Sequence, residues 1–153
     1  MRGEVISGRG KASAVIAKFS KPLEAHFGRR HFGGTLNIVL PQPVRLDPGS
    51  AMIAEQFWPA QVNGMPCLVH RWSACPLHIF EIVSDRNLRD FFKLRDGSAV
   101  ELSGFRCLPL PLAHRLAWHL LWQRRQKLYY LSDKYESWIL KRKSLSWMSA
   151  QGG

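Results

Sequence analysis

The stretch Phe32-Gly33-Gly34-Thr35-Leu36-Asn37-Ile38-Val39-Leu40 is a two-glycine turn that runs directly into a strand pattern. The two glycines can adopt positive φ and allow another group to approach the backbone closely. After them, polar and apolar residues alternate, which predicts a β-strand with one face in a core. The residues of the expected core face are Leu36, Ile38 and Leu40.

The opposite face of this strand, formed by Thr35, Asn37 and Val39, presents two neutral oxygens. The hydroxyl and the amide oxygen would lie about 7 Å apart, two residues along an extended strand. Magnesium prefers oxygen ligands and often keeps waters and substrate phosphates as its other ligands. The pair therefore fits a Mg²⁺ site; the alternative is an ordinary half-buried strand whose two polar residues face solvent.

Short apolar runs and glycine, proline or asparagine turns alternate between residues 4 and 102. Asn63-Gly64 between two apolar runs is a strong β-hairpin signal, and Asp96-Gly97 is typical of a turn. Many short strands with such turns predict an all-β barrel or sandwich. The other expected elements are strands at 4–7, 14–17, 57–62, 65–72, 77–83 and 98–102, short helices at 22–27 and 87–92, and a loop at 41–49.

Composition is that of a globular protein of 153 residues, enough for one domain with a core and a small appendage. No apolar run could span a bilayer, and no apolar signal region follows the N-terminus, so we expect a cytoplasmic protein. Cys67, Cys75 and Cys107 are widely spaced and odd in number, which argues against a zinc site or a disulfide framework. We expect them to be reduced and mostly buried.

The charge is strongly basic and unevenly distributed. The net charge of +11 points to an anionic partner. Residues 1–104 carry 13 Lys and Arg against 9 Asp and Glu, a net charge of +4, whereas residues 105–153 carry 9 against 2, a net charge of +7. We therefore expect a mildly basic β-domain over 1–104, followed by a basic extension over 105–153.

The extension has helical character, because Leu112, Leu116 and Leu120 recur at helical spacing. We expect residues 111–145 to be helical and to pack through this stripe, which Trp118 and Trp122 extend sideways, on the barrel or on a second subunit. The alternative is a basic, tryptophan-bearing face for nucleic acid or lipid. Four of the six tryptophans lie in the extension, at Trp118, Trp122, Trp138 and Trp147.

Two further features suggest binding chemistry. Residues 8–13, Gly-Arg-Gly-Lys-Ala-Ser, form a loop that could direct backbone N–H groups at phosphate, with Arg9 or Lys11 adding charge; a plain turn is the alternative. The sequence has no GxxxxGK[ST] loop of the Walker A type. Glu81 stands among apolar residues of an expected strand, so it lies either on a solvent face or in a site.

Five stretches of the predicted barrel, taken in order, carry a family pattern. They are Gly3-Glu4-Val5-Ile6-Ser7-Gly8-Arg9-Gly10, Gly34-Thr35-Leu36-Asn37, Glu81-Ile82-Val83-Ser84, Leu88-Arg89 and Leu94-Arg95-Asp96-Gly97. Together they resemble the archaeal-type, CTP-dependent riboflavin kinases over roughly residues 3–102. The resemblance implies a small six-stranded cradle-loop barrel, here with a C-terminal helical extension. It also implies Mg²⁺-assisted transfer of the CTP γ-phosphoryl group to riboflavin, giving FMN and CDP.

The resemblance further implies roles for individual residues. Thr35 and Asn37 fall on the family's Mg²⁺ ligands. Glu81 falls on a flavin-contacting residue and is the candidate catalytic residue, which would orient or deprotonate the acceptor hydroxyl; Ser73 falls on its hydroxyl-bearing partner. The implied nucleotide-binding residues are Gly8, Arg9, Gly10, Lys11, Ala12 and Ser13, together with Asn87, Leu88, Arg89 and Asp90.

Departures from the family pattern keep other functions open. Ala12 replaces a glycine, Ala14 and Val15 replace an aromatic pair, and the segment before Ser73 is shorter by about one hairpin. The hypotheses are a CTP-dependent riboflavin kinase, a kinase for another small alcohol, and a non-catalytic barrel that binds nucleotide or flavin. A homo-oligomer formed through the C-terminal helices is the alternative to packing of these helices on the barrel, and nucleic acid or membrane contact is less favoured than either.

Overall fold

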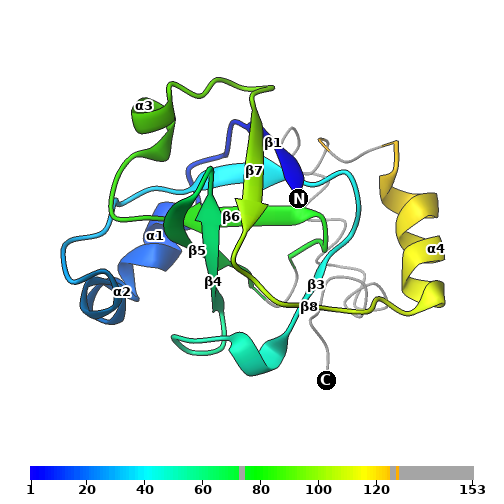
Figure 1. Ribbon diagram of the computed structural model, residues 1–153, viewed down its shortest axis with the longest axis horizontal. Helices are drawn as coiled ribbons and strands as arrows, with labels where there is room; N and C mark the ends of the chain where they lie inside the picture. Colours follow the sequence, from blue (N-terminus) through cyan, green and yellow to red (C-terminus); the bar gives the residue numbers. More distant parts are fainter. Residues whose placement is uncertain (73–74, 125–126, 128–153) are drawn as a thin grey trace.

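A closed barrel of six antiparallel strands, in the order β1-β2-β6-β5-β4-β7, forms the centre of the computed structural model, which describes residues 1–72, 75–124 and 127 (Figure 1). This confirms the expected mainly β fold. The barrel strands are β1 (Arg2–Ile6), β2 (Leu36–Val39), β4 (Phe57–Val62), β5 (Met65–His70), β6 (Ile79–Val83) and β7 (Ala99–Ser103). The other elements are α1 (Ala12–Ala17), α2 (Ser20–Phe27), β3 (Arg45–Leu46), the 3₁₀ turn η1 (Pro48–Ser50), α3 (Leu88–Phe92), β8 (Cys107–Leu108) and α4 (Leu112–Trp122).

The barrel interior is one apolar cluster, built from alternate residues of its strands. Leu36, Ile38 and Leu40 enter this cluster, as the alternation of the β2 segment predicts. Neither of the two glycines before the strand has a positive φ. The close approach occurs at Gly34, where an added Cβ would lie 2.8 Å from the Phe32 ring.

The hairpin predicted at Asn63-Gly64 is confirmed. It joins β4 to β5, which pair along their full lengths. Both turn residues have positive φ, 49° for Asn63 and 80° for Gly64, which is the requirement of a type I′ turn. The tight turn fixes the register between β4 and β5, in which Phe57 lies opposite His70.

Helices cover two separate patches on the outside of the barrel (Figure 1). On one side, Ile16 of α1 and Leu23 of α2 pack with outward-facing Phe57, Leu68 and Val83. On the other side, Trp118 and Trp122 of α4 pack with Val39, Cys75 and Ile79. These two patches leave a strip of barrel wall between them.

Two local sequence predictions are wrong. Residues 14–17, expected as a strand, belong to α1, because a four-residue apolar run fits either structure and the helix buries Ile16 against Leu23. Residues 41–49, expected as a loop, contain β3, which pairs with β8 more than 60 residues later. Local patterns carry no signal for such a pairing.

The packing face of α4 also differs from the prediction. Leu112, Leu116 and Leu120 are 62%, 55% and 85% exposed, so the leucine stripe points away from the barrel. The larger Trp118 and Trp122, four residues apart, form the buried stripe instead. The rest of the predicted helical segment, beyond residue 127, lies outside the described residues, and the division at residue 104 and the homo-oligomer stay predictions.

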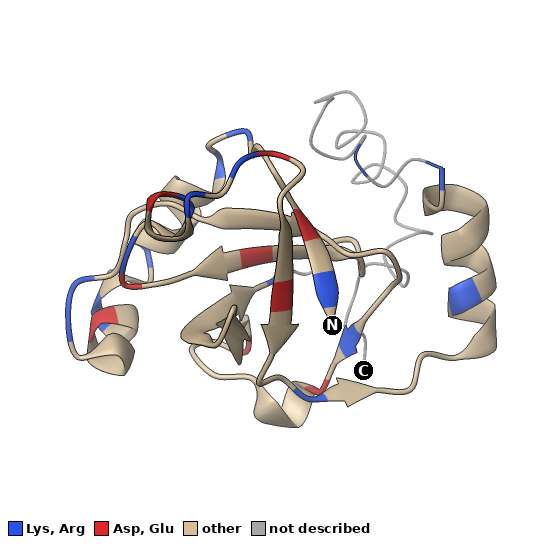
Figure 2. Ribbon diagram, turned by 45° about the horizontal axis from the view of Figure 1, so that its top comes forward, with Lys and Arg blue, Asp and Glu red and all other residues tan. Residues whose placement is uncertain are grey.

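The surface chemistry follows this architecture. Arg2 and Arg45 are the Lys or Arg residues that lie in the described strands, and the other described cations lie in loops and helices around the barrel (Figure 2). Within the described ranges, no helix is long and apolar enough to cross a membrane. Of the three free thiols, Cys67 and Cys75 are buried and Cys107 is exposed; burial raises the pKa of Cys67 to about 12.

Candidate functional site

A polar row crosses the outer face of the barrel between the two helix-covered patches. Asn37 of β2 pairs directly with Glu81 of β6, and Glu81 pairs directly with His70 of β5. Residues directly opposite each other in antiparallel strands point to the same face. The three side chains therefore lie next to one another, although 44 positions separate Asn37 from Glu81 in the chain.

The position of this row follows from the alternation along β6. Its outward-facing residues are Ile79, Glu81 and Val83. Ile79 packs under α4, and Val83 packs under α1 and α2, so Glu81 lies between the two patches. Glu81 is 8% exposed. Its carboxylate therefore lies in a strip of the barrel surface bounded by helices on both sides, rather than on an open solvent face.

The two candidate metal ligands converge. Thr35 Oγ1 lies 3.3 Å from Asn37 Oδ1, much closer than the spacing along an ideal strand suggests, because the side chains turn toward each other. Neighbouring ligands of an octahedral Mg²⁺ with bonds of about 2.1 Å lie about 3 Å apart. The two oxygens therefore fit adjacent positions around one Mg²⁺, with waters and phosphates completing the set. No group of three or more His, Cys, Asp or Glu suited to a metal occurs among the described residues.

The glycine loop after β1 passes directly over Asn37. A Cβ added at Gly8 would lie 1.9 Å from Asn37 Nδ2, so only glycine allows this approach without displacement. Gly10 has a φ of +70°, a conformation that suits glycine. Ala12 and Ser13, predicted as part of the loop, form the first residues of α1, where Ala12 does not need positive φ.

A second connection ties α3 to the same loop. Arg89 donates a hydrogen bond of 2.8 Å to the carbonyl of Ile6 and pairs with Asp96 at 2.9 Å. A hydrogen bond from Ser7, supported by Arg89, holds the pKa of Asp96 below its usual value. Asn87 caps α3 by accepting from the Arg89 amide at 3.1 Å. The capped turn therefore places a partly exposed guanidinium beside the glycine loop.

A pocket of about 150 Å³ brings several predicted nucleotide-binding residues to the candidate metal ligand. Thr35, just before β2, and the first residues of α3, which are far from it in the sequence, both line this pocket. Ligand pockets usually measure about 300–1,000 Å³, so this pocket is smaller than a complete site for a ligand of ordinary size. The lining residues are Phe32, Gly34, Thr35, Leu36, Ile82, Ser84, Arg86, Asn87, Leu88 and Arg89. Asp90 lines the adjacent open cleft instead.

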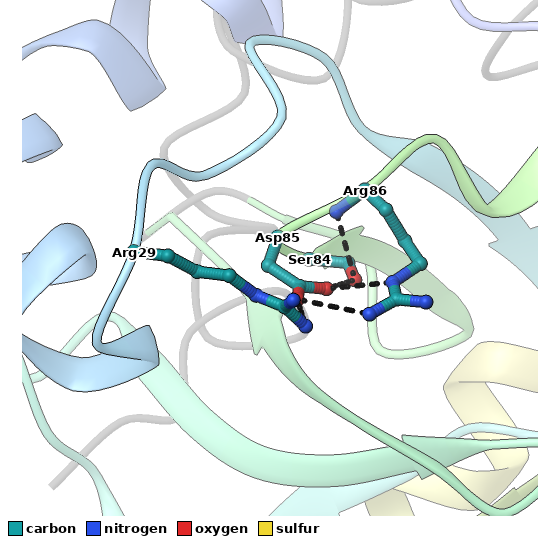
Figure 3. Close-up of polar contacts among 4 residues, drawn as sticks. All are labelled: Arg29, Ser84, Asp85 and Arg86. Carbon is teal, nitrogen blue, oxygen red and sulfur yellow. Dashed lines mark hydrogen bonds and ion pairs between the residues drawn. The ribbon is translucent and has the colours of Figure 1, made fainter.

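A cluster of polar contacts, missed by sequence reasoning, supports one wall of this pocket (Figure 3). Asp85 accepts from Arg86 at 3.2 Å, from the Ser84 hydroxyl at 3.1 Å, and forms an ion pair with Arg29. The Arg86 guanidinium also lies 5.0 Å from the centre of the Phe91 ring. These contacts hold Arg86 at the pocket and join the loop after α2 to the segment after β6.

His70 is the other residue that sequence reasoning missed. Its Nδ1 lies 3.1 Å from Glu81 Oε2, and His70 is 1% exposed. The sequence alone holds no signal for this pair, because it depends on the register between β5 and β6. Ser73, predicted as the partner of Glu81, lies outside the described residues.

The sequence of this chain is similar to that of a known kinase. No family model matches the chain. A riboflavin kinase from Thermococcus kodakarensis is 31% identical over 119 residues, which cover 65% of this chain and 56% of that protein. The chain thus spans little more than half the length of this relative. The similarity is consistent with the kinase-like pattern of the sequence and with the closed barrel.

Proposed function

We propose that this protein is a riboflavin kinase that transfers the γ-phosphoryl group of CTP to the 5′-hydroxyl of riboflavin. The observation that carries the proposal is the convergence of Thr35 Oγ1 and Asn37 Oδ1, 3.3 Å apart, under the Gly8 loop and next to Glu81. The similarity to a riboflavin kinase supports the same acceptor.

The donor side would consist of Thr35, Asn37, the Gly8 loop and Arg89. The two oxygens would hold Mg²⁺, which neutralises charge on the β- and γ-phosphates when bound. Backbone N–H groups of the loop, with Arg9, Lys11 and Arg89, would bind the phosphate oxygens. Positioning and charge stabilisation account for most of the catalysis of phosphoryl transfer. This set of groups would supply both.

The acceptor side would centre on Glu81. Its carboxylate would accept a hydrogen bond from the ribityl hydroxyl and take the proton during transfer. The hydroxyl oxygen forms a bond to the γ-phosphorus, while the bond from that phosphorus to the β–γ bridging oxygen breaks. CDP leaves with that oxygen, and FMN forms. Glu81 next to Asn37 across the sheet would bring acceptor and donor together.

The choice of CTP as donor rests on the family resemblance of the Gly8 loop and the segment around Arg89, together with the missing Walker A loop. Riboflavin with CTP or ATP and Mg²⁺, supplied to the purified full chain, tests the proposal by the appearance of FMN. We expect FMN with CTP. No FMN with either nucleotide would overturn the assignment, and transfer to a different alcohol would identify another kinase.

Removing either candidate metal ligand should abolish this reaction while the protein stays folded. We expect Thr35→Ala and Asn37→Ala each to lower kcat/KM by about 100-fold or more, because transition-state charge loses its counterion. Ser103→Ala, an exposed hydroxyl on β7, is the matched control and should leave the rate unchanged. Near-normal turnover of either variant at limiting Mg²⁺ would show that the metal is bound elsewhere.

A further inference from the structure

The imidazole of His70 is held by two aromatic rings and one carboxylate. Its ring centre lies 4.9 Å from that of Phe57 and 6.1 Å from that of Trp72. Its Nδ1 lies 3.1 Å from Glu81 Oε2. The ring therefore cannot turn without losing both its aromatic packing and its hydrogen bond to the carboxylate.

Packing alone does not account for a histidine at this position. His70 Nε2 is buried and has no hydrogen-bond partner among the described residues. Buried polar atoms are nearly always hydrogen-bonded, and an unpaired one is destabilising. Phenylalanine would fill a similar space between Phe57 and Trp72 without burying an unpaired nitrogen. The feature that only histidine supplies here is the nitrogen that faces Glu81.

Glu81 needs such a partner if it serves the acceptor hydroxyl. A glutamate side chain has three rotatable bonds, and a catalytic group must be held within about 0.5 Å of its productive position. Among the described residues, the side chain within hydrogen-bond distance of this carboxylate is that of His70. Asn37, on the other side of Glu81 in the row, is assigned to the metal.

We propose that His70 is a positioning residue for phosphoryl transfer, which holds Glu81 in place through a hydrogen bond from Nδ1 to Oε2. This inference rests on the proposed function. In this role Nδ1 carries the proton, and the carboxylate keeps Oε1 for the acceptor hydroxyl. His70 itself touches neither nucleotide nor acceptor hydroxyl, so its effect is exerted through Glu81.

Substitutions at position 70 separate the hydrogen bond from the packing. The amide nitrogen of asparagine lies as many bonds from the backbone as Nδ1, whereas that of glutamine lies one bond further. We expect His70→Phe and His70→Gln to lower kcat about 100-fold, with the KM for riboflavin changed less than about threefold. We expect His70→Asn to recover most of that loss. If His70→Phe does not fold, the comparison of Asn with Gln decides.

A double substitution tests whether His70 acts through Glu81. In the Glu81→Ala background, His70→Phe should cause no further loss of kcat, because the group that it positions is already absent. The control is His78→Phe, which removes a buried histidine that accepts from Trp118 at 3.0 Å. This variant should lower the Tm and leave kcat within about twofold.

The possible outcomes are distinct. Wild-type protein that makes no FMN overturns the proposed function, and this inference with it. Active wild type with a normal kcat for His70→Phe and His70→Gln overturns the inference alone. Equal losses for Asn and Gln, or losses that add to those of Glu81→Ala, also overturn it, because they indicate a purely structural histidine.

Discussion

Gly8 lies so close to the Asn37 amide that its missing side chain is part of the site. A methyl group there would meet Asn37 Nδ2 at 1.9 Å, so either the loop or the amide must move. We expect Gly8→Ala to lower kcat/KM by about 100-fold, because a shift of about 1 Å in a positioned ligand is costly. Steady-state FMN formation, measured over a range of Mg²⁺ concentrations, checks this.

Gly33→Ala is the matched control for this substitution. Gly33 is also a glycine next to β2, has no positive φ, and has open space where a Cβ would be placed. Its replacement should leave both activity and Tm within the range of ordinary surface substitutions. Equal activity of the two variants would contradict the close contact between the loop and Asn37.

Arg71 is a buried cation that joins separate segments of the chain. Its guanidinium donates to the carbonyls of Val44 at 2.7 Å, Leu77 at 2.6 Å and Ile79 at 3.2 Å, and it stacks over Phe80. A lysine ammonium is a single point and cannot reach three divergent carbonyls. We expect Arg71→Lys to reduce the free energy of unfolding by about 3 kcal/mol.

Urea denaturation measures this effect, with Arg115→Lys on the exposed face of α4 as the control. The control should change stability by less than about 0.5 kcal/mol. If Arg71→Lys is equally mild, the three carbonyls find other donors and Arg71 does not hold these segments together.

At the scale of single elements, helix α4 attaches to the barrel through tryptophan rather than leucine. Trp118 is buried and donates from Nε1 to His78 Nδ1, whereas Leu120 on the opposite face is exposed. We expect Trp118→Ala to cost about 3–5 kcal/mol of unfolding free energy and Leu120→Ala less than about 0.5 kcal/mol. Thermal unfolding of both variants tests the orientation of α4, and similar losses would contradict it.

Elements whose signals are local were predictable from the sequence. Asn63-Gly64 specifies its turn by backbone preference alone, and Asn87 caps α3 by a side chain three positions or fewer from its partners. The run at 14–17 was misassigned because period-2 and helical patterns are indistinguishable over four residues. For α4, spacing identified a helix. Which of its two apolar stripes is buried was decided by packing against Val39, Cys75 and Ile79, which the sequence does not reveal.

For the molecule as a whole, the candidate site depends on pairings that no local pattern reports. Thr35 and Asn37 stood out because they are polar residues on one strand. The row from Asn37 through Glu81 to His70 exists only once β2, β6 and β5 are in register. The strip also requires helices on both flanks, which the positions of α1, α2 and α4 provide (Figure 1). Long-range assembly, rather than motif chemistry, therefore limited the prediction.

Nucleotide binding should stabilise the whole molecule and reveal the donor. A ligand at about 100 times its Kd adds about 2.7 kcal/mol to the free energy of unfolding. For a chain of this size, that corresponds to a rise in Tm of about 5–10 °C. We expect Mg²⁺ with CDP to produce such a rise at a concentration where Mg²⁺ with ADP produces little.

Two controls locate this effect in the candidate site. Without Mg²⁺, the shift with CDP should shrink, because the phosphates then lack the cation that Thr35 and Asn37 would hold. Asn37→Ala should reproduce that smaller shift even with Mg²⁺ present. Equal stabilisation by CDP and ADP would contradict the choice of CTP, and a full shift for Asn37→Ala would place the nucleotide and its metal away from the β2 oxygens.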